Sequence, residues 1–194
     1  MSLEHAILGF LAAGPQTGYD LKTRCFEGTL SHAWSADQAQ IYRTLDKLLA
    51  REQVTATLIP QRGKPDRRVY EITDAGHEAL TEWLATPIDL PSPRDPLLLR
   101  LHFAGEMPPH VLAKVLERAR DKHEDRATAF RKRLGSPEAF PTCPPLGGER
   151  GRELRERALE SALHAEEQTI AWIDEVIAST TLERTDGTRK RGAQ

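Results

Sequence analysis

The segment 35–49 most constrains the fold, because it has the pattern of an amphipathic helix with a polar, acid-poor outer face. Ser35 and Gln38 have the spacing of a capping box, in which each side chain accepts a hydrogen bond from an otherwise unpaired backbone N–H at the helix start. Apolar residues then recur every three or four positions, at Ile41, Leu45, Leu48 and Leu49. We therefore predict a helix that begins after Ser35 and packs one face on a core.

The opposite face of this predicted helix carries amides, cations and a hydroxyl. Its members are Gln38, Gln40, Arg43, Thr44 and Lys47. Amide side chains can read base edges in the major groove of DNA, and cations can bind phosphates. A merely solvated helix face is the ordinary alternative, and Gln38 also serves the predicted cap, so the interpretation depends on the segments after the helix.

Two predicted strands and a basic loop come next in the chain. Residues 54–59 are rich in β-branched side chains, and residues 68–72 alternate between polar and apolar. The loop between them contains two prolines and a glycine, with cations at Arg62, Lys64 and Arg67. Helix, strand, basic loop and strand form the layout of a winged helix-turn-helix, in which a helix enters the major groove and the loop contacts the DNA backbone or minor groove.

Further helices are predicted on both sides of this unit. Residues 3–13 form an apolar helix, and Thr17, with Asp20 three positions on, caps a second helix that extends to about Leu30. Thr73 caps another helix after the second strand. Trp34 precedes the predicted cap at position 35, where it can fix the entry of the chain. For Trp34, Trp83 and Trp172 we favour packing in the core or the dimer interface over an aromatic ligand pocket.

The second half of the chain is predicted to be helical. Apolar spacing indicates helices over residues 97–103, 109–134 and 149–179, with a proline-rich and glycine-rich loop at 136–148. The fold class is thus mainly α, of the α+β kind. We expect a winged helix-turn-helix domain over 1–86, a proline-rich linker over 87–96, a helical dimerisation domain over 97–180, and a disordered tail over 181–194.

The last predicted helix has an apolar stripe that two long helices alone are too few to bury. A second copy of the chain would supply the missing surface, so we predict a homodimer. The predicted interface residues are Leu159, Leu163, Ile170, Trp172, Ile173 and Ile177.

The charge distribution supports a local DNA-binding surface. The whole chain has a formal net charge of −2, which alone is unlike a nucleic-acid-binding protein. Residues 36–70, however, contain seven Lys or Arg against four Asp or Glu, a local charge of about +3. This distribution favours salt-sensitive binding by one part of the chain and excludes a protein that coats nucleic acid nonspecifically.

No pattern in the sequence indicates catalysis or a bound metal. The seven histidines are scattered, and no phosphate-binding glycine loop or nucleophile motif is present, so we predict neither enzyme activity nor a cofactor. The two cysteines, Cys25 and Cys143, lack metal-ligand spacing, and the apolar runs are too short to span a bilayer. Together with a start that lacks a basic signal-peptide region, these features predict a cytoplasmic protein with reduced thiols.

Several segments resemble the PadR family of bacterial transcriptional regulators. They are the helix at 3–11, Gly18-Tyr19-Asp20, Trp34-Ser35, the hexapeptide Gln-Ile-Tyr-Arg-Thr-Leu at 40–45, and residues 68–76. The C-terminal half resembles the family in layout and length. The resemblance implies a homodimer that binds a near-palindromic operator, usually as a repressor, and that in some relatives is released by a phenolic acid or another small aromatic molecule.

The resemblance also implies positions for the DNA contacts. It places Gln38, Gln40, Tyr42 and Arg43 on the recognition helix, Arg62, Gly63 and Lys64 at the wing tip, and Tyr19 and Lys22 near phosphates. For Tyr42 we favour a mixed role, with the ring packed and the hydroxyl near a phosphate. The alternative function is a winged-helix adaptor that binds proteins and has no sequence-specific affinity for DNA.

Overall fold

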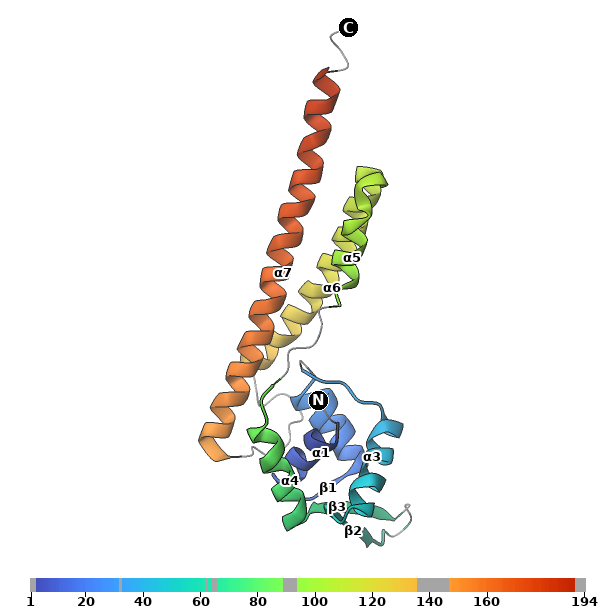
Figure 1. Cartoon of the computed structure of the whole chain (residues 1–194), viewed down its shortest axis with the longest axis vertical. Helices are drawn as coiled ribbons and strands as arrows, with labels where there is room; N and C mark the ends of the chain where they lie inside the picture. Colours follow the sequence, from blue (N-terminus) through green and yellow to red (C-terminus); the bar gives the residue numbers. More distant parts are fainter. Residues whose placement is uncertain are drawn as a thin grey trace. The chain divides into compact units, whose positions relative to one another are not determined.

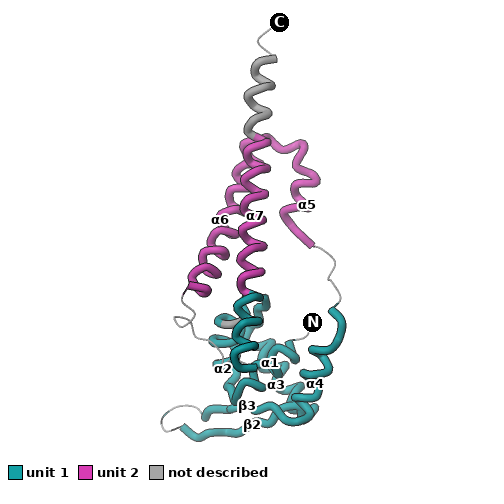
Figure 2. The backbone as a smooth tube through the Cα atoms, turned by 90° about the vertical axis from the view of Figure 1, so that its left-hand side faces the viewer, with its two compact units in different colours: residues 1–89, 136–158 teal, residues 90–135, 159–194 magenta. Residues whose placement is uncertain are grey.

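The computed structural model describes residues 3–31, 33–61, 63, 66–88, 94–135 and 147–190, without the side chains of residues 29 and 181–190. The chain divides into two compact units, 1–89 with 136–158 and 90–135 with 159–194, and each is described by itself (Figure 2). None of the helices in these described ranges is long and apolar enough to cross a membrane.

The first unit combines helices with a small antiparallel sheet (Figure 1). Its helices are α1 (Leu3–Leu11), α2 (Gly18–Asp20) with its continuation η1 (Leu21–Thr29), α3 (Gln38–Ala50) and α4 (Asp74–Ala85). Its strands are β1 (Gln16–Thr17), β2 (Val54–Ile59) and β3 (Arg67–Ile72), in the order β1-β3-β2. β2 and β3 pair along their full lengths, from Val54 opposite Ile72 to Ile59 opposite Arg67. The predicted winged helix-turn-helix is confirmed, and the pair β2–β3 is its wing.

The core of this unit lies where α3 meets α1, η1 and the sheet. Ile41, Leu45 and Leu48 of α3 have no exposed surface, as the apolar spacing predicted. Tyr70 of β3 and Cys25 of η1 are also fully buried in this cluster. Cys25 is disulfide-bonded, so the prediction of a reduced thiol is wrong at this position. Trp34 and Trp83 pack against its edge, which supports core packing for both rings.

The helix caps agree with the sequence at two of three positions. Thr17 and Asp20 form the predicted capping box, and the hydroxyl of Thr73 accepts from the Gly76 N–H at 3.2 Å. The predicted box of Ser35 and Gln38 is wrong.

The N-cap of α3 is instead Asp37, whose Oδ1 accepts from the backbone N–H of Gln40 at 2.7 Å. Oε1 of Gln40 accepts in return from the backbone N–H of Asp37 at 3.1 Å. Asp37 has the extended backbone that an N-cap requires, and its carboxylate at the helix start is also favoured by the helix dipole.

The second helix has the predicted extent but another hydrogen-bond pattern. Over Leu21–Thr29 it is a π-helix, and at its end the Leu30 N–H donates to the carbonyl of Cys25, five residues back, at 2.8 Å. β1 was not predicted. Gln16 pairs with Tyr70 and Thr17 with Val69, so this two-residue strand holds the start of α2 against the centre of β3.

The second unit contains α5 (Pro96–His102), the short 3-10 helix η2 (Ala104–Glu106), α6 (Pro109–Gly135) and most of α7 (Gly148–Lys190). Ion pairs join α6 to α7, with Arg120 Nε 2.6 Å from Asp174 Oδ1 and Arg131 Nη2 3.0 Å from Glu167 Oε1. Between them, the buried carboxylate of Glu166 contacts His123 and Arg126. The predicted helices are thus present.

Two of the predicted dimer-interface residues are already covered within a single chain. Ile173 is fully buried and Ile170 nearly so, because both pack inside the unit that α6 and α7 form. Leu159, Leu163, Trp172 and Ile177 are half-buried. α7 runs on to Lys190, whereas the sequence predicted a disordered tail from residue 181.

Candidate nucleic-acid interface

α3 presents the predicted polar face with one exception. Gln38, Gln40, Arg43 and Lys47 are exposed. Thr44 is buried, and its hydroxyl donates to the Gln40 carbonyl at 2.8 Å. Its assignment to the outer face was therefore wrong, because Thr44 stands one turn from both Ile41 and Leu48 and shares their side of the helix.

Gln40 has a double role at the start of α3. Its amide oxygen is engaged by the backbone N–H of Asp37 in the capping box. The amide nitrogen remains as the donor that can reach a base edge. Gln38 is the first residue of α3 and lies between the two members of this box, and its exposed side chain does not form the cap that the sequence predicted for it.

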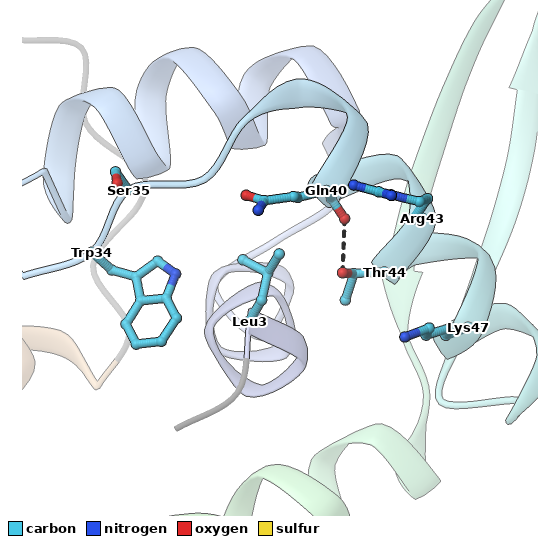
Figure 3. Close-up of a pocket in the computed structure, with 7 residues that line it drawn as sticks. All are labelled: Leu3, Trp34, Ser35, Gln40, Arg43, Thr44 and Lys47. Atoms are coloured by element: carbon cyan, nitrogen blue, oxygen red, sulfur yellow. Dashed lines mark hydrogen bonds between the residues drawn. The ribbon is translucent and has the colours of Figure 1, made fainter. Parts of the chain in front are cut away.

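An open pocket of about 370 Å³ borders this face. Figure 3 shows Leu3 of α1 and the indole of Trp34 on one side, with Gln40, Arg43 and Lys47 of α3 on the other. Arg43 Nε donates to the Ala39 carbonyl at 3.2 Å, which holds the guanidinium along the helix. Within the described residues, neither Arg43 nor Lys47 forms an ion pair, so both cations are available to an anionic partner.

The start of α2 lies against α3 through Tyr42. The Tyr42 ring, 37% exposed, occupies the space beside Gly18, and the adjacent Tyr19 is 64% exposed. Lys22, one turn further on, has its Nζ 3.6 Å from Glu27 Oε1. The Tyr42 ring packs beside Gly18, and the contact of its hydroxyl with a phosphate stays a prediction. Lys22 is partly neutralised by its acid neighbour.

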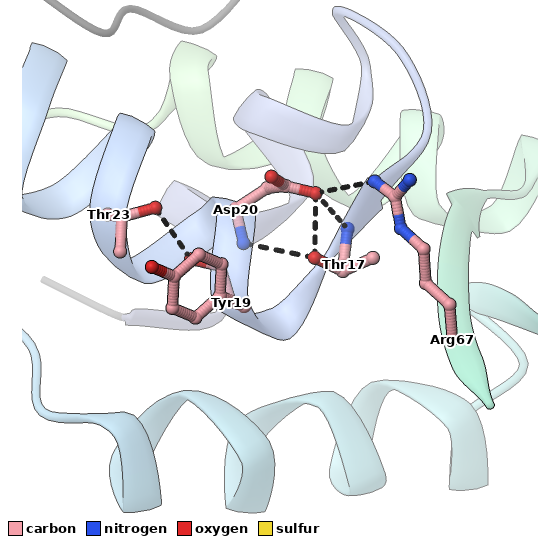
Figure 4. Close-up of polar contacts among 5 residues, drawn as sticks. All are labelled: Thr17, Tyr19, Asp20, Thr23 and Arg67. Atoms are coloured by element: carbon pink, nitrogen blue, oxygen red, sulfur yellow. Dashed lines mark hydrogen bonds and ion pairs between the residues drawn. The ribbon is translucent and has the colours of Figure 1, made fainter. Parts of the chain in front are cut away.

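Asp20 joins the start of α2 to the wing (Figure 4). Its Oδ2 accepts from the Thr17 hydroxyl at 2.7 Å and from Arg67 Nη2 at 2.9 Å. Burial by itself raises the pKa of Asp20, but the hydrogen bonds from Thr17 and Arg67 outweigh it and leave the pKa below its ordinary value. Arg67, predicted as a DNA contact, therefore has an intramolecular carboxylate partner.

The neighbouring cation of β3 also has an acid partner. Arg68 Nη1 lies 3.9 Å from Asp46 Oδ1 of α3, and its guanidinium lies 5.3 Å from the centre of the Tyr70 ring. This pairing supports leaving Arg68 out of the predicted DNA contacts.

At the wing tip, Gly63 has a positive φ of 73°, which glycine adopts without strain, and is exposed. Arg62 and Lys64 lie outside the described residues, as does Cys143. Among the residues that the structure does describe, no three His, Cys, Asp or Glu side chains are grouped to hold a metal ion.

The acid partners of the two wing cations, Asp20 and Asp46, were absent from the predicted interface. Asp20 had a local signal only as a capping residue, and its contact with a residue 47 positions away has no sequence signature. Asp46 lies one turn after Tyr42 and one residue before Lys47. An acid beside cations on an otherwise acid-poor face is the signal that could have suggested an ion-pair partner.

Both halves of the chain match known protein families. The PadR-like transcriptional regulator family matches residues 7–82, and the C-terminal region of the virulence activator alpha family matches residues 93–180. The probable transcriptional regulator Rv1176c of Mycobacterium tuberculosis is 32% identical over 190 residues, which cover 91% of this chain and 96% of that protein. The negative transcriptional regulator PadR of Bacillus subtilis is 28% identical over 181 residues, which cover 91% of this chain and 96% of that protein.

Solved structures agree with these matches. Bacillus subtilis PadR in complex with operator DNA has a TM-score of 0.77 and 26% identity, covering 92% of this chain and 98% of its own. The Vibrio cholerae virulence activator AphA has a TM-score of 0.74 and 27% identity, and the match covers 94% of this chain and 99% of the AphA chain. On the basis of the matched family domain and a relative similar over nearly its whole length, the chain belongs to the PadR-like family, whose members are transcriptional regulators and not enzymes.

Proposed function

We propose that this protein is a sequence-specific DNA-binding regulator that acts as a homodimer, with α3 in the major groove and the wing on the DNA backbone or minor groove. The observation that carries the proposal is the exposed face of α3, where two amides and two cations without carboxylate partners among the described residues stand together. The operator complex of Bacillus subtilis PadR supports it by analogy. Binding to chromosomal DNA would place this activity in the cytoplasm.

The residues of this face divide by chemistry into two roles. Gln38 and the amide nitrogen of Gln40 are suited to base edges, where they would set sequence preference. Arg43 and Lys47, together with Arg62 and Lys64 of the wing loop, are suited to phosphates, where they would add affinity for every sequence. Two half-sites about 10 bp apart, or a multiple of that spacing, would fit a symmetric dimer.

The dimer interface that we propose lies in the second unit. The α7 residues that keep partial exposure, Leu159, Leu163, Trp172 and Ile177, would contact a second copy, while Ile170 and Ile173 would support them from inside. Leu98 and Phe103 near α5 are 52% and 72% exposed, and apolar exposure of this extent in one unit also favours a partner. The mass of the protein in solution by light scattering would test this part of the proposal.

Repression is the regulatory outcome that we favour, because a relative similar over nearly its whole length is a negative regulator. A small aromatic acid would relieve it, as the existence of a PadR complex with p-coumaric acid suggests for that relative. Such a ligand would act only if it bound the DNA-free form more tightly than the DNA-bound form. Titration of p-coumaric acid, with operator affinity as the readout, would test this step.

The test of the main proposal is the affinity of the full-length protein for the DNA upstream of its own gene, compared with a scrambled fragment of equal length and composition, at two salt concentrations. The expected result is preference for the native fragment and a steep loss of affinity with salt. Weak and equal binding to both fragments, together with no change when Arg43 and Lys47 are both replaced by alanine, would favour the adaptor function instead.

A further inference from the structure

We propose that Asp20 is a positioning residue for the wing, and that Arg67 acts on DNA binding through Asp20 and not through a phosphate. The inference rests on the proposed DNA binding and assigns a role to an acid that lies at the proposed interface. An acid at such a place is unfavourable for DNA affinity by its charge alone, so its presence calls for a structural function.

The contacts of Asp20 come from two sides. Its Oδ2 accepts from the hydroxyl and the backbone N–H of Thr17, at 2.7 and 3.3 Å, and from Arg67 Nη2 at 2.9 Å. The Asp20 side chain is 19% exposed, against 50% for Arg67. In Figure 4 the Arg67 side chain extends from β3 to the start of α2, where Thr17 and Asp20 lie. One carboxylate therefore joins the helix-turn-helix to the wing.

The position of Arg67 makes this contact important for the wing loop. Arg67 is the first residue of β3 and pairs with Ile59, the last residue of β2, so residues 60–66 extend from this pair. Thr17 is itself paired with Val69 in the sheet. The start of α2 thus contacts β3 at two points, and a change at Arg67 would alter the direction in which the basic loop leaves the sheet.

The chain offers a matched control in the second acid of this surface. Asp46 and Arg68 are 3.9 Å apart at their nearest charged atoms, but both side chains are exposed, at 68% and 47%. No hydrogen bond accompanies this ion pair among the described residues. Asp20→Asn and Asp46→Asn remove the same charge from the same unit, and only the first removes a partly buried partner of the wing.

The experiment measures the affinity of full-length variants for the DNA fragment upstream of the protein's own gene, at several salt concentrations. Asp46→Asn should bind DNA slightly more tightly than wild type, because a negative charge is lost. Asp20→Asn should bind about two- to fivefold more weakly, the range expected for loss of a partly exposed ion pair. Arg67→Gln should weaken DNA binding by a similar factor. The double variant Asp20→Asn with Arg67→Gln should bind DNA no more weakly than Arg67→Gln alone, because both changes remove the same contact.

The salt dependence separates positioning from direct contact. A phosphate contact would lower the slope of log affinity against log salt by about one when Arg67 is replaced, whereas a positioning residue leaves the slope unchanged. Asp20→Asn could disturb the start of α2, because Asp20 belongs to its capping box. Arg67→Gln leaves this capping box intact, so it tests the contact with the wing independently of the helix cap. An asparagine at position 20 still offers an oxygen to Thr17.

Hydrogen exchange of the wing amides in the DNA-free protein gives a second measurement. Amides of β2 and β3 should exchange faster in Asp20→Asn and Arg67→Gln and at the wild-type rate in Asp46→Asn. Any one of four results would overturn the inference. Two concern affinity: equal effects of Asp20→Asn and Asp46→Asn, or additive losses in the double variant of Asp20 and Arg67. The others are a lower salt slope for Arg67→Gln, or wing amides that exchange at the wild-type rate in Asp20→Asn and Arg67→Gln. A wild-type protein without operator affinity would instead overturn the proposed function, and the exchange rates would still decide whether Asp20 holds the wing.

Discussion

The ring of Tyr42 lies so close to Gly18 that a Cβ atom built on Gly18 would be 2.6 Å from its Cζ and 2.9 Å from its hydroxyl oxygen. Gly18 begins α2 and Tyr42 belongs to α3, so this contact sets the separation of the two helices in the helix-turn-helix. Because the ring is only partly buried, it can move outward when it is pushed.

Replacement of Gly18 by alanine should displace the Tyr42 ring and destabilise the protein. Overpacking of this kind costs about 1–3 kcal/mol, and the lower half of the range applies because the obstacle is the end of a side chain. Urea unfolding would measure the loss. The double variant Gly18→Ala with Tyr42→Ala should lose little more than Tyr42→Ala alone. The control is Gly9→Ala in α1, where a Cβ would be 3.9 Å from the nearest side-chain atom and stability should be kept or increased.

Gln40→Glu should separate the two roles of Gln40. Glutamate at the third helical position also completes a capping box, so the free energy of unfolding should change by less than about 0.5 kcal/mol. The amide donor is lost, so preference for the operator over a scrambled duplex should fall by about 1–3 kcal/mol if Gln40 reads a base. Gln61→Glu, at an exposed glutamine outside α3, adds the same charge to the same unit and controls for general repulsion. Unchanged preference in Gln40→Glu would remove this residue from base recognition.

Lys47→Ala should weaken binding to all duplexes alike and should lower the salt slope by about one. Anisotropy titrations over a range of salt concentrations give both quantities. Lys114, an exposed lysine of α6, provides a variant with the same charge change in the other unit. If Lys47→Ala and Lys114→Ala have equal effects, the cation on α3 acts only through net charge.

The pH dependence of stability should contain a contribution from His5. Its ring stacks on Trp83 with centres 5.0 Å apart, and burial lowers the pKa of His5 below its ordinary value of about 6.5. As pH falls through about 6.5, the unfolded chain takes up a proton that the folded chain does not, so stability is lost until the folded pKa is reached. His5→Phe keeps a stacked ring without titration. Urea unfolding at pH 7.5 and about 5.5 should show a smaller loss for this variant than for wild type, and equal losses would contradict the assignment.

The carboxylate of Glu166 should stabilise the contact of α6 with α7. It is buried beneath His123 and Arg126, whose side chains are partly exposed and can be hydrated when the acid is removed. Glu166→Gln should therefore cost about 2 kcal/mol, less than the loss of a fully buried ion pair. The adjacent Glu167→Gln breaks an exposed pair with Arg131 and should cost less than about 1 kcal/mol. A loss for Glu166→Gln no larger than this control would contradict its assigned role.

The parts of the fold that local patterns determine could be predicted. Thr17 and Thr73 each stand alone as a capping side chain before a predicted helix, Thr17 also with an acid three residues on, and both caps are correct. The start of α3 was ambiguous because Ser35 and Asp37 both precede a glutamine by three residues. Local spacing does not distinguish the two boxes, and the carboxylate forms the one that is present.

Contacts between distant segments could not be predicted in this way. The side chain of Asp20 meets Arg67 only because β1 and β3 pair, and a two-residue strand such as Gln16–Thr17 is too short for a strand pattern. The π-helical hydrogen bonds of η1 were likewise not predicted, although the buried Leu21 and Phe26 stand five residues apart, which is the spacing of one π-helical hydrogen bond. Thr44 shows a related limit, since residue type suggested exposure while its place on the helix gave burial.

Selection of bound duplexes from a random-sequence pool tests the central claim most directly, because it does not depend on where the natural operator lies. The account predicts enrichment of a near-palindromic sequence whose half-sites are about 10 bp apart, or a multiple of that spacing, and loss of this enrichment when Gln38 and Gln40 are both replaced by alanine. A pool that gains no common sequence after repeated selection with the wild-type protein would contradict specific DNA recognition by α3.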